Sequence, residues 1–244
     1  MSVELVSVSK GVGKFSDRDG QDLITDIARV SNPKNQGKDG AGLVKYLIDN
    51  KHWSPFEHLF ITFEIETTRA ISAQLCRHRS FTFQEFSQRY SKVGRIPVPE
   101  LRTKAETNRQ SSEEVIEAEH ILRAAFESIE DSKSTYTLLL NNGVAKETAR
   151  GLLPMCTPTT LYMTGSIRSW LHFLAVRMDA HAQKEAQEIA ASIYKSLAIE
   201  FPDIMDAWDR LQEEDYIKQK LWENYCETTR LEHEADQDVT GILT

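Results

Sequence analysis

The chain has 244 residues, of which 40% are hydrophobic and 27% charged, and its formal net charge is -8. That length and composition are typical of one soluble globular domain and exclude a disordered or fibrous chain. The acidic balance argues against nucleic-acid binding, and the absence of a long apolar window or a signal segment argues against a membrane partner, so we expect a cytoplasmic protein.

The first third of the chain alternates strands and helices. Val3–Val8 predicts a strand, and Gly11-Val12-Gly13 is interpreted as a turn because it lacks the third glycine of a dinucleotide fingerprint. Helical spacing predicts one helix over 23–28, which stops before Pro33, and a second over 43–48. Leu59–Glu66 alternates apolar and polar residues, as in a half-buried antiparallel strand.

A short helix over Arg69–Cys76 leads into the densest charged segment of the chain, Arg77–Tyr90. Residues 67–104 carry eight Lys and Arg against two Asp and Glu, a balance of +6, whereas residues 211–244 have a balance of -6. Arginine forks match phosphate and carboxylate oxygens, so this basic island suits a small anionic ligand.

Aromatic residues interleave with these arginines, namely Phe81, Phe83, Phe86 and Tyr90. We expect this aromatic area to be buried, which would place the guanidinium groups at the rim of a buried site. The alternative is a solvated surface turn held by salt bridges.

Helices dominate the second half. Ser111–Glu114 resembles a capping box, which predicts a long helix along one face from Val115 to Leu140, ended by Asn142-Gly143. A short helix over Lys146–Pro154 and a core strand over Leu161–Thr164 follow. If helix persists through 166–183, Arg168 pairs with His172 and Arg177 with His181 on shared faces. A further long helix follows from Ala182 to Leu197.

The predicted fold class is therefore α+β, an antiparallel sheet core packed with long helices. We expect a single catalytic domain over 1–205 and an acidic, helical, peripheral extension over 206–244 that contains Trp208, Trp222 and Tyr225. Cys76, Cys156 and Cys226 are too few and too scattered for a disulfide framework, so we expect non-catalytic thiols. His52 and His58 lack partners at a metal-binding spacing, and no metal is expected.

Three separated segments each contribute arginine with histidine or glutamate: Arg77–Arg89, Arg150 and Arg168–His181. Their convergence would be costly without an anionic ligand, such as a nucleotide phosphate or the pyrophosphate of a dinucleotide cofactor. The residues alone therefore point to a nucleotide-handling enzyme.

Two motifs carry a family resemblance. Arg77-His78-Arg79, seven residues, and Ser87-Gln88-Arg89 resemble the R-H-R-x7-S-x-R signature of the flavin-dependent thymidylate synthases. The stretch from His52 to His58 is similar to the family's H-x-[ST]-P-F-E-H segment, which lines the flavin pocket. The resemblance spans residues 31–183 and implies that family's fold, with dUMP methylated to dTMP by 5,10-methylenetetrahydrofolate and with NADPH reducing FAD.

The resemblance also implies roles for individual residues. Those that would face FAD are Ser54, Arg77, His78, Arg79, Glu85, Ser166, Ile167, Arg168, His172 and His181. Those that would hold dUMP are Gln74, Arg77, Glu85, Ser87, Gln88, Arg89, Arg150 and Arg177. Arg177 looks like the family's catalytic arginine, which stabilises the N3-deprotonated uracil. Ser87 lacks a recognisable base partner, so a hydrogen bond to the phosphate is expected of it rather than nucleophilic attack.

Ser166 and His172 stand where many members of the family have asparagine, and both can hydrogen-bond as asparagine does. The family further implies a homotetramer whose active sites are shared between subunits. Two alternatives stay open at the level of sequence: a non-enzymatic regulator that senses a nucleotide, and a flavoprotein of other reductive chemistry. A regulator need not be yellow, so the visible spectrum would separate it from both enzymes.

Overall fold

The computed structural model of the chain describes residues 1–18, 20–106 and 111–217. Its centre is an antiparallel sheet with the spatial order β1 (Ser2–Val8), β2 (Phe60–Thr68), β6 (Pro158–Ser166) and β3 (Thr82–Glu85). A second, two-stranded sheet joins β4 (Arg102–Lys104) to β5 (Ser112–Val115). The strands predicted over Val3–Val8, Leu59–Glu66 and Leu161–Thr164 are confirmed as parts of β1, β2 and β6. The fold class is the expected α+β.

The alternation in β2 decides which face of the sheet is buried. Ile61, Phe63 and Ile65 have no solvent exposure, whereas Glu64 and Glu66 point to the opposite face. Each β2 residue pairs with a residue of β6, so these two strands form the rigid centre on which the helices pack.

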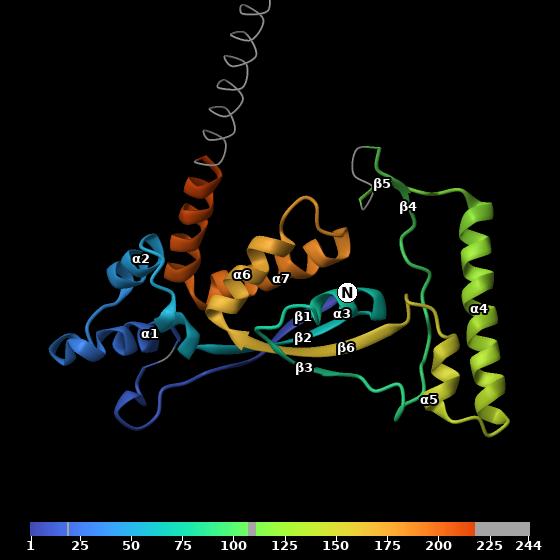
Figure 1. The fold of residues 1–244 in the computed structure, drawn as a ribbon, viewed down its shortest axis with the longest axis horizontal. Helices are drawn as coiled ribbons and strands as arrows, with labels where there is room; N and C mark the ends of the chain where they lie inside the picture. Colours follow the sequence, from blue (N-terminus) through green and yellow to red (C-terminus); the bar gives the residue numbers. More distant parts are fainter. Residues whose placement is uncertain (19, 107–110, 218–244) are drawn as a thin grey trace, which may run out of the picture.

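Helices flank this sheet (Figure 1). They are α1 (Gly20–Ala28), α2 (Ala41–Asp49), α3 (Arg69–Leu75), α4 (Glu119–Asn141), α5 (Lys146–Ala149), α6 (Ile167–Arg177) and α7 (Lys184–Glu200). Short 3₁₀ turns occur at η1 (Gly13–Phe15), η2 (Arg29–Ser31), η3 (Pro33–Asn35), η4 (Ser54–His58) and η5 (Arg150–Leu152). Residues 202–217 are helical as well. None of the helices in the described part of the chain is long and apolar enough to cross a membrane.

The core lies between the sheet and α6 with α7. Trp170 of α6 is fully buried, stacks edge-on against Phe63 at 5.0 Å and Phe81 at 4.6 Å, and donates its indole N–H to the Ile61 carbonyl at 3.2 Å. Phe81 follows the first arginines of the charged segment. Its burial therefore fixes that segment to the core.

The helix over 202–217 is not peripheral, contrary to the expectation. Its apolar residues, Ile204, Met205, Ala207, Trp208 and Leu211, are buried in the same core as the sheet. Helical spacing of these residues explains the difference, because the acidic residues between them occupy the outer face. Trp222, Tyr225 and Cys226 lie outside the described residues.

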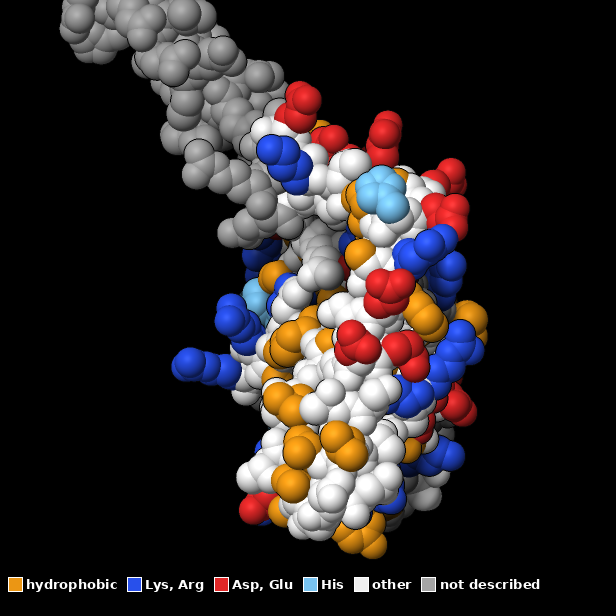
Figure 2. All heavy atoms as spheres, turned by 90° about the vertical axis from the view of Figure 1, so that its right-hand side faces the viewer, with side chains coloured by type: hydrophobic (Ala, Val, Ile, Leu, Met, Phe, Trp, Pro, Cys, Tyr) orange, Lys and Arg blue, Asp and Glu red, His pale blue; other side chains and the backbone are white. Residues whose placement is uncertain are grey.

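The long helix α4 stands beside the sheet and packs on α5 and η5 (Figure 1). Ile129 and Tyr136 are buried, whereas Phe126 and Leu138 are exposed. Figure 2, which views the molecule from the α4 side, shows hydrophobic side chains at this surface. The predicted single apolar face is therefore only partly covered within one chain.

The predicted capping box over Ser111–Glu114 is wrong. Ser112 lies in β5, where its hydroxyl accepts from Arg102 Nε at 2.7 Å, and the Glu114 amide donates to the Thr103 hydroxyl at 3.1 Å. The helix begins at Glu119 after Ala118, which gives no side-chain cap. Pairing with β4, whose last residue lies eight positions before Ser112, has overridden the local helix signal.

Candidate functional site

The C-terminal end of α6 meets α3 at a cluster built around Arg177. Arg177 Nε donates to His78 Nε2 at 2.9 Å, and Nη2 donates to the Gln74 carbonyl at 3.0 Å. The His78 ring lies 5.0 Å from Phe173 of α6. A cation at the last residue of a helix is favourable because it faces the negative end of the helix dipole.

Both partners of this contact have shifted pKa values. Burial lowers the pKa of His78 to about 4, and the charges of Arg177 and His172 act in the same direction. Burial and the neighbouring Arg77 lower the pKa of Arg177. His78 is thus neutral at neutral pH, with its Nε2 lone pair facing Arg177 and its proton on Nδ1.

No carboxylate within residues 1–18, 20–106 and 111–217 pairs with Arg177. Asp179 instead accepts from the His181 amide at 2.8 Å and from His181 Nδ1 at 2.7 Å. Glu185 is held by Arg102 Nη2 at 2.8 and 2.9 Å. Since Asp179 and Glu185 are the acids nearest in sequence, a purely structural salt bridge is not what fixes Arg177.

The predicted helical pairing of Arg177 with His181 is wrong, because α6 ends at Arg177. The His181 amide donates to the Asp179 side chain and not to the backbone carbonyl that a continued helix would require. The next helix, α7, begins only at Lys184. Arg168 and His172 do share α6 as expected. Gln183, just before α7, accepts from Gln74 Nε2 at 2.6 Å, so Gln74 touches the segment that carries His181.

A second cluster forms at the other end of α6 around Glu57 of η4. Ser166 Oγ donates to Glu57 Oε2 at 2.5 Å, and Arg168 Nη1 donates to Oε1 at 2.8 Å. Ser166 is buried and also caps α6 by accepting from the Ser169 amide at 3.3 Å. Glu57 is not among the residues predicted from the sequence to form the site, although it stands in the stretch from His52 to His58. Ile167 is fully buried, and Ser54 is exposed on η4.

Glu85, at the end of β3, is tied into the protein by three side chains. Arg69 Nη1 lies 2.7 Å from Oε2, and Ser72 and Thr159 donate to Oε1 at 2.6 and 3.0 Å. Arg69 was also missed, since it precedes the signature by eight residues. This network orients Glu85 beside the loop that carries Ser87.

Arg89 and Arg150 converge on Glu147 of α5. Arg89 Nη2 lies 3.0 Å from the Glu147 carboxylate, and Arg150 Nε donates to the Glu147 carbonyl at 3.3 Å. Gln88 is buried and its Nε2 has no hydrogen-bond partner within the described chain. Ser87 is exposed on the same loop. The structure therefore brings together four of the residues expected to hold dUMP.

The expected burial of the interleaved aromatic residues is wrong for two of them. Phe81 is 7% exposed, but Phe86 is 38% and Tyr90 83% exposed. Beyond Glu85 the chain leaves the sheet edge and its loop meets α5, where Arg89 pairs with Glu147 and Lys146 donates to the Tyr90 carbonyl at 2.6 Å. Ser87 and Arg89 of this loop are nevertheless exposed.

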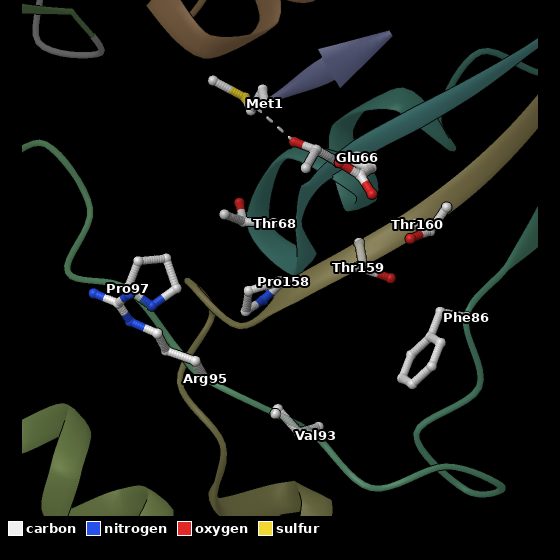
Figure 3. Close-up of a pocket in the computed structure, with 12 residues that line it drawn as sticks. Met1, Glu66, Thr68, Phe86, Val93, Arg95, Pro97, Pro158, Thr159 and Thr160 are labelled. Atoms are coloured by element: carbon white, nitrogen blue, oxygen red, sulfur yellow. Dashed lines mark hydrogen bonds between the residues drawn. The ribbon is translucent and has the colours of Figure 1, made fainter. Parts of the chain in front are cut away.

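A hollow of about 470 Å³ is lined by none of the residues predicted to bind FAD or dUMP. Figure 3 shows Phe86, Val93 and Arg95, on the segment after β3, facing Pro158 and Thr159 of β6. A hollow of about 310 Å³ does contain Arg168 and His172, together with Trp53 and Leu171.

The residues fit a flavin dinucleotide by donor type. Arg77 and Arg79 are exposed and make no side-chain ion pair across residues 1–18, 20–106 and 111–217. Two unpaired guanidinium groups supply what a pyrophosphate requires, and the hollow with Arg168 and His172, lined by two tryptophans, offers a surface for a flat ring. Among the described residues, no group of three or more His, Cys, Asp or Glu could hold a metal ion.

Comparison with known proteins gives concordant matches. The family model described as "Thymidylate synthase complementing protein" matches residues 15–203. A probable flavin-dependent thymidylate synthase of Paramecium bursaria Chlorella virus 1 is 43% identical over 215 residues, covering 86% of this chain and 99% of the relative. A flavin-dependent thymidylate synthase of Synechocystis sp. is 42% identical over 188 residues, covering 76% and 87%. The solved structure of a UMP/dUMP methylase from Streptomyces cacaoi, bound with 5-Br dUMP, superposes with a TM-score of 0.71 at 29% identity, covering 86% and 94%.

Proposed function

Because the chain belongs to the flavin-dependent thymidylate synthase family, an FAD-dependent group of methyltransferases that make dTMP, we propose how its own residues divide that work. The observation that carries the proposal is Arg177, a half-buried cation held by a neutral imidazole and a carbonyl and by no carboxylate of the described chain. Its charge is therefore available to a ligand.

Arg177 activates the uracil ring. Its Nε and Nη2 are engaged by His78 and Gln74, so the guanidinium is held in place while Nη1 has no partner in the part of the chain that the structure describes. A fixed cation in a partly dehydrated site favours the N3-deprotonated form of uracil, which makes the ring more electron-rich. Because the Arg177 guanidinium is held in place before the reaction, the site needs little reorganisation when negative charge develops on the uracil ring.

The dUMP phosphate binds at the loop after β3. Arg89 exchanges its exposed contact with Glu147 for the phosphate, and Arg150 adds a second cation beside it. Ser87 donates its hydroxyl to a phosphate oxygen, and the unsatisfied amide of Gln88 supplies another donor. Gln74, Arg77 and Glu85 complete the dUMP set, with Glu85 oriented by Arg69 and Ser72.

FAD, when bound, supplies the redox and carbon-transfer chemistry. The chain orients it with cations, hydrogen-bonding groups and an aromatic wall. The proposed FAD residues are Ser54, Arg77, His78, Arg79, Glu85, Ser166, Ile167, Arg168, His172 and His181. The Ser166 hydroxyl already bonds Glu57 and the Ser169 amide, so Ser166 acts by positioning Glu57 and the start of α6. The Ile167 side chain is buried in the core, so Ile167 acts by fixing the position of the backbone at the FAD site.

We further propose 5,10-methylenetetrahydrofolate as the carbon donor, NADPH as the reductant, a homotetramer with shared active sites, and a cytoplasmic location. The Arg177 cluster and the Arg89 cluster share no hydrogen bond within the described residues, which supports completion of the site by another subunit. The exposed Phe126 and Leu138 on α4 offer apolar area for such contacts.

Anaerobic incubation of the purified protein with dUMP, 5,10-methylenetetrahydrofolate and NADPH tests this function. The protein should show flavin absorbance and form dTMP, with no product when dUMP or the folate is omitted. Failure to bind FAD at micromolar concentrations, or flavin reduction without dTMP, would contradict the proposal.

A further inference from the structure

The hollow that contains Arg168 and His172 has a wall made by the helix over 202–217. In Figure 1 this helix, coloured orange-red, stands between α2 and α6. It contributes Trp208, Leu211, Gln212 and Asp215 to the lining. The opposite walls are formed by Trp53, which directly precedes η4, and by Leu171 and Ala175 of α6. Two cations, Lys51 and Arg168, stand in the same lining.

The chemistry of the lining favours a flat aromatic ring. Two indoles and two leucines line the hollow, and its two cations are each paired with a carboxylate, Lys51 with Asp215 and Arg168 with Glu57. The volume of about 310 Å³ lies at the lower end of the roughly 300–1,000 Å³ typical of small-molecule sites. It therefore suits one ring system of a dinucleotide and not the whole cofactor.

This helix is fixed to the rest of the protein at several points. Lys51 Nζ lies 3.0 Å from Asp215, and Arg210 Nη2 lies 2.9 Å from Asp49. Tyr194 of α7 donates to Asp209 at 2.5 Å, and Trp208 and Leu211 are buried in the core. The wall is consequently an ordered part of the fold, although the family match ends at residue 203.

We propose that the helix over 202–217 is part of the FAD site, with a flat ring of FAD seated between Trp208 and Leu211 on one side and α6 on the other. The inference rests on the proposed function, because FAD is the aromatic dinucleotide which that function requires. It assigns a role to the beginning of the acidic extension: Gln212 lines the hollow, and the Lys51–Asp215 pair holds the helix against it.

Gln212→Trp fills the hollow and is the direct test, with Glu213→Trp as the matched control because Glu213 is exposed and does not line it. FAD affinity of the apoproteins is measured by flavin fluorescence, and folding by circular dichroism. We expect Gln212→Trp to weaken FAD binding at least tenfold and Glu213→Trp to change it less than twofold. If Gln212→Trp does not fold, Ala175→Phe fills the same hollow from α6 and should give the same loss.

Titrations with FMN and ADP identify the ring, since only the fragment that carries the seated ring should lose affinity in the filled variant. Loss with either fragment supports the inference. Equal FAD affinity in wild type and in the folded, filled variant overturns it and leaves the proposed function standing. A wild-type protein that binds no FAD overturns the proposed function itself.

Discussion

The two arginine clusters differ in what holds their cations. Arg177 is half-buried and is positioned by a neutral histidine and a backbone carbonyl, whereas Arg89 is exposed and rests against the Glu147 carboxylate. A cation with neutral partners keeps its charge available inside a partly dehydrated site, where electrostatic effects are strongest. A cation with an exposed acidic partner can exchange that partner for a phosphate at little cost. The first arrangement suits catalysis and the second suits binding.

The largest expected effect follows loss of Arg177. Arg177→Ala should reduce turnover of the FAD-loaded enzyme by about 10²–10³, the range typical for removing one preorganised donor, and affect dUMP affinity less. Arg177→Lys should also be badly impaired, because lysine keeps the charge but loses the planar fork. Steady-state dTMP formation measures both.

Arg123→Ala, which removes an exposed arginine of α4, is the control and should retain turnover. Lower thermal stability of Arg177→Ala with near-normal turnover per folded, FAD-loaded enzyme would assign Arg177 a structural role instead.

Arg89→Ala should weaken dUMP binding by about ten- to a hundredfold, since a hydrogen bond to a charged group is worth about 1.5–3 kcal/mol. Flavin content should change much less. Calorimetric titration with dUMP measures the affinity, and an unchanged value would remove Arg89 from the phosphate site.

Glu147→Gln should act in the opposite direction and more weakly. Glu147 competes with the phosphate for Arg89, and an exposed pair of this kind is worth about 0.2–1 kcal/mol, so dUMP should bind up to about fivefold more tightly. The gain should vanish in the Arg89→Ala background. A loss of affinity in Glu147→Gln would show that the carboxylate assists binding.

The smallest effect concerns pH. Because the folded protein holds the pKa of His78 near 4, below its usual value of about 6.5, the unfolded chain binds more protons between these values. The contribution of His78 to stability is thus present above pH 6.5 and is lost as the pH falls towards 4. Thermal unfolding of the apoprotein from pH 4 to 7 should show a shallower slope for His78→Gln than for wild type. Identical slopes would contradict the neutral His78.

Local sequence patterns were sufficient to predict those helices and strands whose structure depends on their own residues alone. The alternation of Leu59–Glu66 predicted both the strand and its buried face, and the short helix predicted over Arg69–Cys76 is α3. They failed where pairing with another segment decides the structure. Ser112 belongs to β5 because it pairs with Lys104 of β4 and its hydroxyl accepts from Arg102, which no local helix signal reveals.

The site residues divide in the same way. Arg177 and His78 could be named from their motifs, but their mutual contact joins positions 99 residues apart and depends on the packing of α6 on α3. Glu57 was overlooked because its partners, Ser166 and Arg168, lie more than 100 residues away. The wall around Trp208 is likewise formed only when the last described helix packs on α6.

The central claim is that Arg177 stabilises the N3 anion of uracil, and the ionisation of N3 in bound dUMP tests it most directly. NMR of isotope-labelled dUMP, titrated with pH on the FAD-loaded enzyme, reports this ionisation without turnover. We predict an N3 pKa clearly lower than that of free dUMP in wild type and in Arg123→Ala, and no such lowering in Arg177→Ala. An N3 pKa in wild type equal to that of free dUMP would contradict the account.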